Sequence, residues 1–319
     1  MIGSRTALSG NVRTVLGDIA AADLGPANYH EHLFQVTPLL PGDELDDEAA
    51  SGEEAVLLRD SGFTAMVDAT PIGLGRRPGA LARISRTTSL RVVATTGVHK
   101  EEHYGGDHWV LAASEQELAT AFRDDVLLGL PRDDTIATAG RTTVRAGMIK
   151  MGVGYWRISA FERRAASAVG AAHCVTGAPV MVHLEHGSAG HEVLDLLERE
   201  GVALSSVVLA HVDRNPDPQL HADLAARGAY LGYDGFARHR EWPDSVVLAC
   251  MAAAAAVGAT ERLVIGGDVA RRTRYLSYGG MPGLGYVGSR VVPRLREVVG
   301  ESVTRKVLVE NPARLLGRF

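Results

Sequence analysis

The stretch Asn28-Tyr29-His30-Glu31-His32 closes the first short apolar run of the chain and is typical of the end of a strand. Side chains alternate along a strand, so His30 and His32 face one way while Glu31 faces the other. Two imidazoles that converge from one strand are a good start for a metal site, although His-x-His also occurs by chance. The stretch therefore predicts a strand and leaves its metal-binding role open.

Seven further short apolar runs follow, with helix-like segments between them. They are rich in β-branched residues and lack clean polar alternation, which is typical of strands buried on both faces of a parallel sheet. The eight predicted strands cover residues 27–32, 64–68, 91–97, 147–150, 179–183, 207–211, 229–234 and 262–268.

Amphipathic helices are predicted over 161–176, 190–200 and 218–227, each followed by a glycine that can cap it. Strand and helix alternate through eight repeats, which favours a (β/α)8 TIM barrel preceded by a short hairpin over 11–19. A doubly wound sheet is the alternative, but no Gly-x-Gly-x-x-Gly turn follows the first strand. Segments 97–114 and 271–288 are expected to be long loops at the barrel mouth.

Composition places few limits on the fold and several on the partners. The chain of 319 residues is 46% hydrophobic and 22% charged, which suits a single barrel domain over 1–319. Its net charge is -5, and no Lys/Arg run stands clear of acids, so neither nucleic acid nor an anionic membrane is an expected partner. The longest apolar run, 246–258, is too short to span a bilayer.

The cellular compartment is predicted from the N-terminus and the cysteines. No signal-type apolar core follows residues 1–5. Cys174 and Cys250 lie in Ala-rich, helix-like stretches and are predicted to be buried thiols in a reducing compartment. We therefore expect a cytoplasmic protein.

Polar residues close most of the predicted strands. The carboxyl ends of barrel strands meet at one mouth, where active sites are built. One pocket is therefore predicted to hold His30, His32, Lys150, His183, His211 and Asp268. Four imidazoles and one carboxylate suit zinc, manganese or cobalt. They are too many for one catalytic zinc with an open position, so two divalent ions about 3.5–4 Å apart, sharing a hydroxide nucleophile, use them better.

Lys150 is the unusual member of this set. A protonated ammonium beside two divalent cations would be repelled, so Lys150 is predicted to be neutral or modified. A carbamate formed with CO₂ would turn its side chain into an anionic bridging ligand.

Matching motifs run through nearly the whole chain, from 14–17 to 310–314. The central ones cover 28–34, 147–150, 176–187, 208–211 and 228–235. On these motifs the chain resembles the phosphotriesterase family of the amidohydrolase superfamily. The resemblance implies a binuclear centre in which His30, His32 and Asp268 hold the more buried ion. His183 and His211 would hold the more exposed ion.

The same resemblance implies further roles within the centre. A carboxylated Lys150 and a hydroxide would bridge the two ions, and Asp268 would take the proton as the hydroxide attacks. Members of this family hydrolyse phosphotriesters, lactones and other esters, and they often form dimers, so a homodimer is expected.

Three stretches narrow the substrate: 211–218, 234–238, and 267–271 together with 278–284. They look most similar to the phospho-furanose lactonase branch, which opens phosphorylated sugar lactones. Arg214, Arg238, Arg271 and Arg272 follow the last three predicted strands and would rim the mouth. The planar guanidinium suits a phosphate monoester dianion. Some of these arginines could instead pair with local acids.

Further residues are assigned by their place at strand ends and in mouth loops. The predicted substrate contacts are His99, Lys100, Arg238, Arg271 and Tyr278. His99 stands where lactonases of this family often carry tyrosine and phosphotriesterases tryptophan. Surface positions are predicted for the loop and helix-start histidines His103, His108, His186, His191 and His239.

Three functions remain under consideration. The first is a binuclear-metal hydrolase that opens a small-molecule sugar lactone, phosphorylated in the favoured form, with Asp268 as the proton acceptor. The second is a lactonase or esterase for unphosphorylated substrates with side activity on phosphotriesters. The third is a catalytically silent metal-dependent scaffold, and the presence of every expected ligand argues against it.

Overall fold

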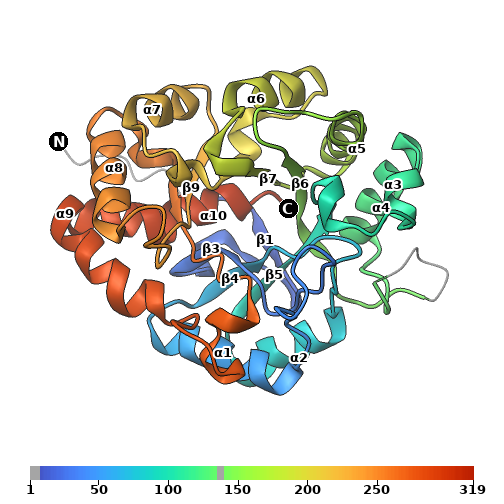
Figure 1. Ribbon diagram of the computed structural model, residues 1–319, viewed down its shortest axis with the longest axis horizontal. Helices are drawn as coiled ribbons and strands as arrows, with labels where there is room; N and C mark the ends of the chain where they lie inside the picture. Colours follow the sequence, from blue (N-terminus) through green and yellow to red (C-terminus); the bar gives the residue numbers. More distant parts are fainter. Residues whose placement is uncertain (1–7, 135–139) are drawn as a thin grey trace.

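The computed structural model describes residues 8–134 and 140–319. Eight parallel strands form one sheet in chain order, and helices surround it (Figure 1). The strands are β3 (Ala27–Glu31), β4 (Ala65–Asp68), β5 (Arg91–Gly97), β6 (Ala146–Val153), β7 (Val180–Leu184), β8 (Val207–Ala210), β9 (Tyr230–Tyr233) and β10 (Leu263–Ile265). An antiparallel hairpin, β1 (Asn11–Thr14) and β2 (Gly17–Ala20), precedes them. The fold is the predicted (β/α)8 barrel with its N-terminal hairpin.

The last strand lies beside the first and nearly closes the barrel. The backbone N–H of Asp268, just beyond β10, donates to the carbonyl of His30 in β3 at 3.0 Å. One residue further, the N–H of Val269 donates to the Glu31 carboxylate at 3.0 Å. These bonds bring the segment after β10 directly against His30 and the end of β3.

Helices follow the strands around the outside of the barrel. They are α1 (Glu48–Asp60), α2 (Pro78–Thr88), α3 (Trp109–Ala112), α4 (Glu115–Leu127), α5 (Ala160–Thr176), α6 (Gly190–Arg199), α7 (Pro218–Ala226), α8 (Asp244–Ala256), α9 (Val292–Arg305) and α10 (Asn311–Leu316). Capping boxes start α4 and α5, where Ser114 and Ser159 exchange hydrogen bonds with Glu117 and Glu162. Gly177 ends α5 in the left-handed conformation, as predicted.

Short 3-10 and π turns join these elements. They are η1 (Ala21–Asp23), η2 (Glu101–His103), η3 (Glu185–Gly187), η4 (Leu204–Ser206), η5 (Val212–Arg214), η6 (Ala259–Arg262), η7 (Arg272–Arg274), η8 (Leu276–Tyr278), η9 (Val287–Val291) and η10 (Lys306–Glu310). The two predicted mouth loops, 97–114 and 271–288, contain η2 and α3 in one case and η7, η8 and the start of η9 in the other. Both are therefore largely irregular.

The core has two layers because the strands are buried on both faces. An inner cluster takes alternate strand residues such as Met148, Met181 and Val264, together with side chains of the hairpin and α10. An outer cluster packs the intervening residues, such as Ile149 and Val182, against the helices. Side chains fill the barrel and the hairpin and α10 cover one end, which leaves the opposite end for a site.

Two expectations need correction. Lys150 does not end its strand, because β6 continues to Val153; it stands level with Gly97, the last residue of β5, and so still reaches the mouth. Cys250 is buried as predicted, but Cys174 is exposed near the end of α5.

Within 8–134 and 140–319, no helix combines the length and apolarity needed to cross a bilayer. Residues 1–5, on which the absence of a signal segment was predicted, lie outside the described part of the chain.

Candidate metal centre

The first pair of histidines is His30, in β3, and His32, directly after it, and their hydrogen bonds fix which nitrogen is free. His30 Nδ1 lies 3.0 Å from a carboxylate oxygen of Asp234 and donates to it. His32 Nδ1 donates to the Thr70 hydroxyl at 2.7 Å, because that hydroxyl gives its own hydrogen to the Phe34 carbonyl. In the neutral imidazole the other nitrogen then carries a lone pair. Both rings thus present Nε2 as an acceptor.

The Nε2 atoms of both rings lie next to the carboxylate of Asp268. Its carboxylate oxygen Oδ1 lies 3.5 Å from His30 Nε2 and 3.6 Å from His32 Nε2. His30 Nε2 is buried, and it has no hydrogen-bond partner among the described residues. Buried polar atoms are rarely left without a partner. Lone pairs and a carboxylate gathered within 4.8 Å of one another form a donor set that suits a cation.

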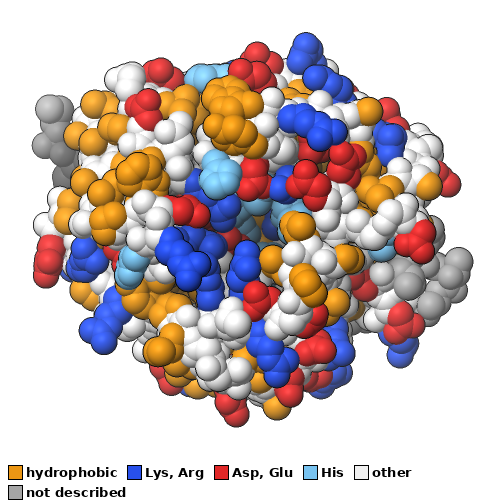
Figure 2. Space-filling model, viewed as in Figure 1, with side chains coloured by type: hydrophobic (Ala, Val, Ile, Leu, Met, Phe, Trp, Pro, Cys, Tyr) orange, Lys and Arg blue, Asp and Glu red, His pale blue; other side chains and the backbone are white. Residues whose placement is uncertain are grey.

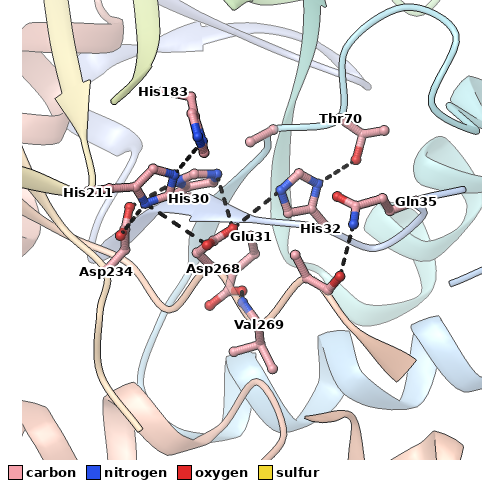
Figure 3. A network of polar contacts seen from close by, with 12 residues as sticks. His30, Glu31, His32, Gln35, Thr70, His183, His211, Asp234, Asp268 and Val269 are labelled. Atoms are coloured by element: carbon pink, nitrogen blue, oxygen red, sulfur yellow. Dashed lines mark hydrogen bonds and ion pairs between the residues drawn. The ribbon is translucent and has the colours of Figure 1, made fainter. Parts of the chain in front are cut away.

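A second pair, His183 and His211, also has one nitrogen of each ring that donates to a carboxylate and one that does not (Figure 3). His211 Nδ1 donates to Asp234 at 2.7 Å, and His183 Nε2 donates to Glu185 at 3.2 Å. The remaining nitrogens, His183 Nδ1 and His211 Nε2, are 2.9 Å apart. Burial lowers the pKa of His211 to about 4 and that of His183 well below its usual value, so both rings are neutral near pH 7. Two lone pairs that face each other are suited to a shared cation.

Asp234, which the sequence did not single out, connects the two pairs. Its buried carboxylate accepts hydrogen bonds from His30, His211 and the hydroxyl of Tyr29. Burial alone would raise the pKa of Asp234, but the interactions with His211 and His30 hold it well below its usual range. Carboxylates that orient ligating imidazoles in this way set the tautomer of each ring. The available signal was its place at the end of the seventh predicted strand.

Lys150 is fully buried beside these groups. Its Nζ donates to the Ala69 carbonyl at 2.9 Å. Burial lowers the pKa of Lys150 to about 8, against the opposing charges of Asp268 and Asp234. Part of the amine is therefore neutral near pH 7, and the neutral amine is the form that reacts with CO₂.

The six predicted ligands line a single cavity of about 320 Å³ at the barrel mouth. Figure 2 shows the hollow near the middle of this face, with histidine side chains at its base and Lys and Arg side chains beside it. Of the predicted substrate contacts, His99, Lys100, Arg238 and Arg271 also line it. Tyr278 does not, because its hydroxyl bonds to the backbone of Asp47 and to Ser51 on α1.

Arginines stand around the open side of the cavity. Arg214 and Arg238 both reach the Asp268 carboxylate, Arg214 at 3.2 Å, and Arg238 also donates to the Asp268 carbonyl at 2.6 Å. Arg271 pairs with Asp43 at 3.4 Å. Arg274 was not predicted; it lines the cavity and makes no ion pair with an acid of the described chain. Burial, followed by the charge of Arg238, lowers the pKa of Arg274 to about 10.

Lys100 and His103 differ from their predicted surroundings. The Lys100 ammonium contacts two carboxylates, those of Glu185 and Glu102, so its charge is already compensated. His103 was expected on the surface, but it is half-buried. The centroid of its ring lies 3.7 Å from the centroid of the His99 ring. The spacing of His99 and His103 across one short loop was the signal that could have paired them.

Sequence comparison agrees with this geometry. The profile of the Phosphotriesterase family matches residues 10–316. The chain belongs to the phosphotriesterase family. Among curated relatives in this family, a phospho-furanose lactonase of Mycoplasmopsis synoviae is 26% identical over 95% of this chain and 91% of its own length. A human N-acetyltaurine hydrolase is 25% identical over 98% of this chain and 99% of its own length.

Solved structures support the same placement within the phosphotriesterase family. A lactonase from Listeria monocytogenes superposes with a TM-score of 0.88 at 31% identity, covering 97% of this chain and 99% of its own. The protein is therefore a metal-dependent hydrolase that acts on ester bonds.

Metal removal gives a first prediction for this phosphotriesterase-family site. A cation between His183 and His211 would relieve the repulsion of two lone pairs, and the unfolded chain would not hold these ligands together, so metal is expected to bind the folded state. With free metal at 100 times its Kd, each site should stabilise the fold by about 2.7 kcal/mol. We expect a chelator to lower the melting temperature measured by circular dichroism. An unchanged melting temperature in protein shown to be stripped of metal would contradict this.

Proposed function

We propose that this protein opens a phosphorylated sugar lactone, using two divalent ions held at the barrel mouth. The observation that carries the proposal is the arrangement of free imidazole nitrogens. Two face Asp268 and two face each other, while their opposite nitrogens are occupied by fixed acceptors. A scaffold without metal would have no reason to leave these lone pairs buried and converging.

The ligands divide into two sets. His30, His32 and Asp268 would hold the more buried ion, and His183 and His211 the more exposed one. Lys150, as a carbamate, would lie between them, and zinc, manganese or cobalt suits this mixture of nitrogen and oxygen donors. Such ions lower the pKa of bound water to about 7 and polarise a carbonyl oxygen.

Asp268 is the proposed proton acceptor for the attacking water. Burial alone would raise the pKa of Asp268, but the charge of Arg238 helps to hold it well below its usual range, so the carboxylate is ionised and can accept a proton. Arg214 and Arg238 both contact Oδ2 of Asp268 and fix the orientation of the carboxylate. After the ring C–O bond breaks, the proton on Asp268 passes to the departing alkoxide.

The phosphate assignment rests on the arginines. Arg274 lies in the cavity wall with Arg238 and Arg271 and lacks an acidic partner in the described chain, so an anionic substrate group would relieve this crowding of like charges. A guanidinium binds a phosphate through paired charge-assisted hydrogen bonds. Binding remote from the reacting carbon would hold the lactone in its attack position. The name of the Mycoplasmopsis relative supports a phosphorylated furanose lactone.

The alternative is an enzyme for unphosphorylated lactones or esters with side activity on phosphotriesters. The human relative, named for an N-acylated sulfonate, adds an anionic amide as a substrate to include. Protein reconstituted with manganese or zinc and bicarbonate should be given a pentonolactone 5-phosphate, its unphosphorylated parent, an acyl-homoserine lactone, an aryl phosphotriester and N-acetyltaurine. We expect the highest kcat/KM for the phosphorylated lactone.

Arg274→Ala supplies the specificity test. Charge-assisted hydrogen bonds contribute about 1.5–3 kcal/mol, so kcat/KM for the phosphorylated lactone should fall roughly 10–100-fold, with little change for its parent. Arg272→Ala is the matched control, because Arg272 is exposed and stacks on Tyr278 outside the cavity. Equal rates on the two pentonolactones would keep the metal centre and reject the phosphate assignment.

A further inference from the structure

His99, the second residue after β5, is held by its backbone and by its ring. Its N–H donates to the Tyr104 hydroxyl at 2.9 Å, and that hydroxyl gives its hydrogen to the Ile72 carbonyl at 3.0 Å. Its ring nitrogen Nδ1 accepts the backbone N–H of Lys100 at 2.8 Å. A neutral imidazole that accepts at Nδ1 carries its hydrogen on Nε2. The fold thus selects one tautomer of His99.

The neighbours of the ring leave it little freedom to turn. His103 stacks on it, with ring centroids 3.7 Å apart and an interplanar angle of 35°. The ring of His183 lies 4.5 Å away between centroids. Below, a Cβ at Gly152 of β6 would lie 3.1 Å from the Lys100 nitrogen and 3.3 Å from His99 Nδ1. Because Gly152 has no Cβ, this turn can approach β6 closely. The His99 ring is therefore restricted by His103, His183, the Lys100 backbone and β6.

The remaining polar atom of His99 is Nε2. No hydrogen bond to it is formed within 8–134 or 140–319, and it is not sealed from solvent. The ring lines the metal cavity beside His183, a proposed ligand of the more exposed ion. The nearby Lys100 ammonium is less available than His99 Nε2 to donate to a substrate, because it already contacts Glu185 and Glu102.

We infer that His99 is a catalytic hydrogen-bond donor, whose Nε2–H binds the substrate carbonyl oxygen and stabilises the negative charge that develops there. The inference rests on the proposed lactone hydrolysis. His99 transfers no proton: water adds to the carbonyl carbon, the ring C–O bond breaks, and the proton released from water reaches the alkoxide through Asp268. A donor that is fixed before the reaction needs no reorganisation as the charge appears.

Two substitutions separate the donor from the ring. His99→Phe keeps an aromatic ring to stack on His103 and removes the donor. His99→Gln removes the ring and keeps an N–H that reaches as far as Nε2. His191→Gln is the matched control, because His191 lies on α6 and does not line the cavity. Metal content and melting temperature are measured for all three.

We expect H99F to lower kcat for lactone opening by about 10²–10³-fold with KM changed less than about threefold, as for loss of an oxyanion donor. H99Q should recover at least part of that loss. A cyclic phosphonate, which presents a tetrahedral anion in place of the carbonyl, should bind H99F more weakly by a similar factor. A tetrahydrofuran analogue without the carbonyl should bind both proteins equally.

The inference is overturned if H99F retains kcat within threefold, or if kcat falls while phosphonate affinity is unchanged. If H99F does not fold, the phosphonate affinities of wild type, H99Q and His99→Leu are compared instead. An H99Q affinity that is no closer to wild type than the His99→Leu affinity contradicts the donor role. If wild-type protein opens no lactone, the proposed function fails, and phosphonate affinity still tests the donor separately.

Discussion

Asp268→Asn should lower kcat for lactone opening by about 10²–10⁴-fold, the range associated with loss of a general base. The amide keeps the shape of the side chain but cannot accept the proton of the attacking water. It also removes the charge that faces His30 and His32 on one side and Arg214 and Arg238 on the other. Stopped-flow or steady-state assays with a pH indicator measure the change directly.

The matched control is Asp217→Asn, at the N-cap of α7. Asp217 accepts from the backbone of Gln219 and Leu220, and asparagine is as good a cap, so stability and rate should be unchanged. A wild-type rate in D268N at full metal content would remove Asp268 from the proton-transfer role.

Lys150→Ala should abolish the bridge between the two proposed ions. The loss of activity should exceed the roughly 10–100-fold typical of a residue that only hydrogen-bonds to a ligand, because a proposed ligand itself is removed. Metal content should fall below two ions per chain, measured by inductively coupled plasma mass spectrometry. A small carboxylate such as acetate or propionate should restore part of the activity by occupying the place of the carbamate.

Lysine is scarce in this sequence, which makes the control simple. The chain has three lysines, Lys100, Lys150 and Lys306. Lys306 pairs with Glu261 on the surface, far along the chain from the metal ligands, so Lys306→Ala should keep both metal content and rate. Two ions and full activity in K150A would show that Lys150 does not bridge them.

Much of this architecture could be predicted because parallel barrels leave a clear pattern. Strands buried on both faces, such as Val207–Ala210, appear as unbroken apolar runs, and glycines such as Gly177 mark where helices end. The rule that strand ends meet at one mouth then gathers distant residues such as His30 and Asp268. These inferences depend on local pattern and topology, which the sequence carries directly.

The rest of the site depends on side-chain directions that no local pattern encodes. The role of Asp234 comes from its position between His30, in β3, and His211, directly after β8. Arg274 differs from the exposed Arg272 only in which way a short turn points each side chain. Tyr278 turned to α1 rather than to the cavity, where sequence similarity had suggested it would lie.

The most direct test is a metal titration of the apoprotein in the presence of bicarbonate, with bound metal and the rate of lactone opening measured on the same samples. The converging nitrogens of His30, His32, His183 and His211 predict that the rate reaches its plateau at two ions per chain. A plateau at one ion per chain, or hydrolysis that does not depend on bound metal, would contradict the binuclear centre.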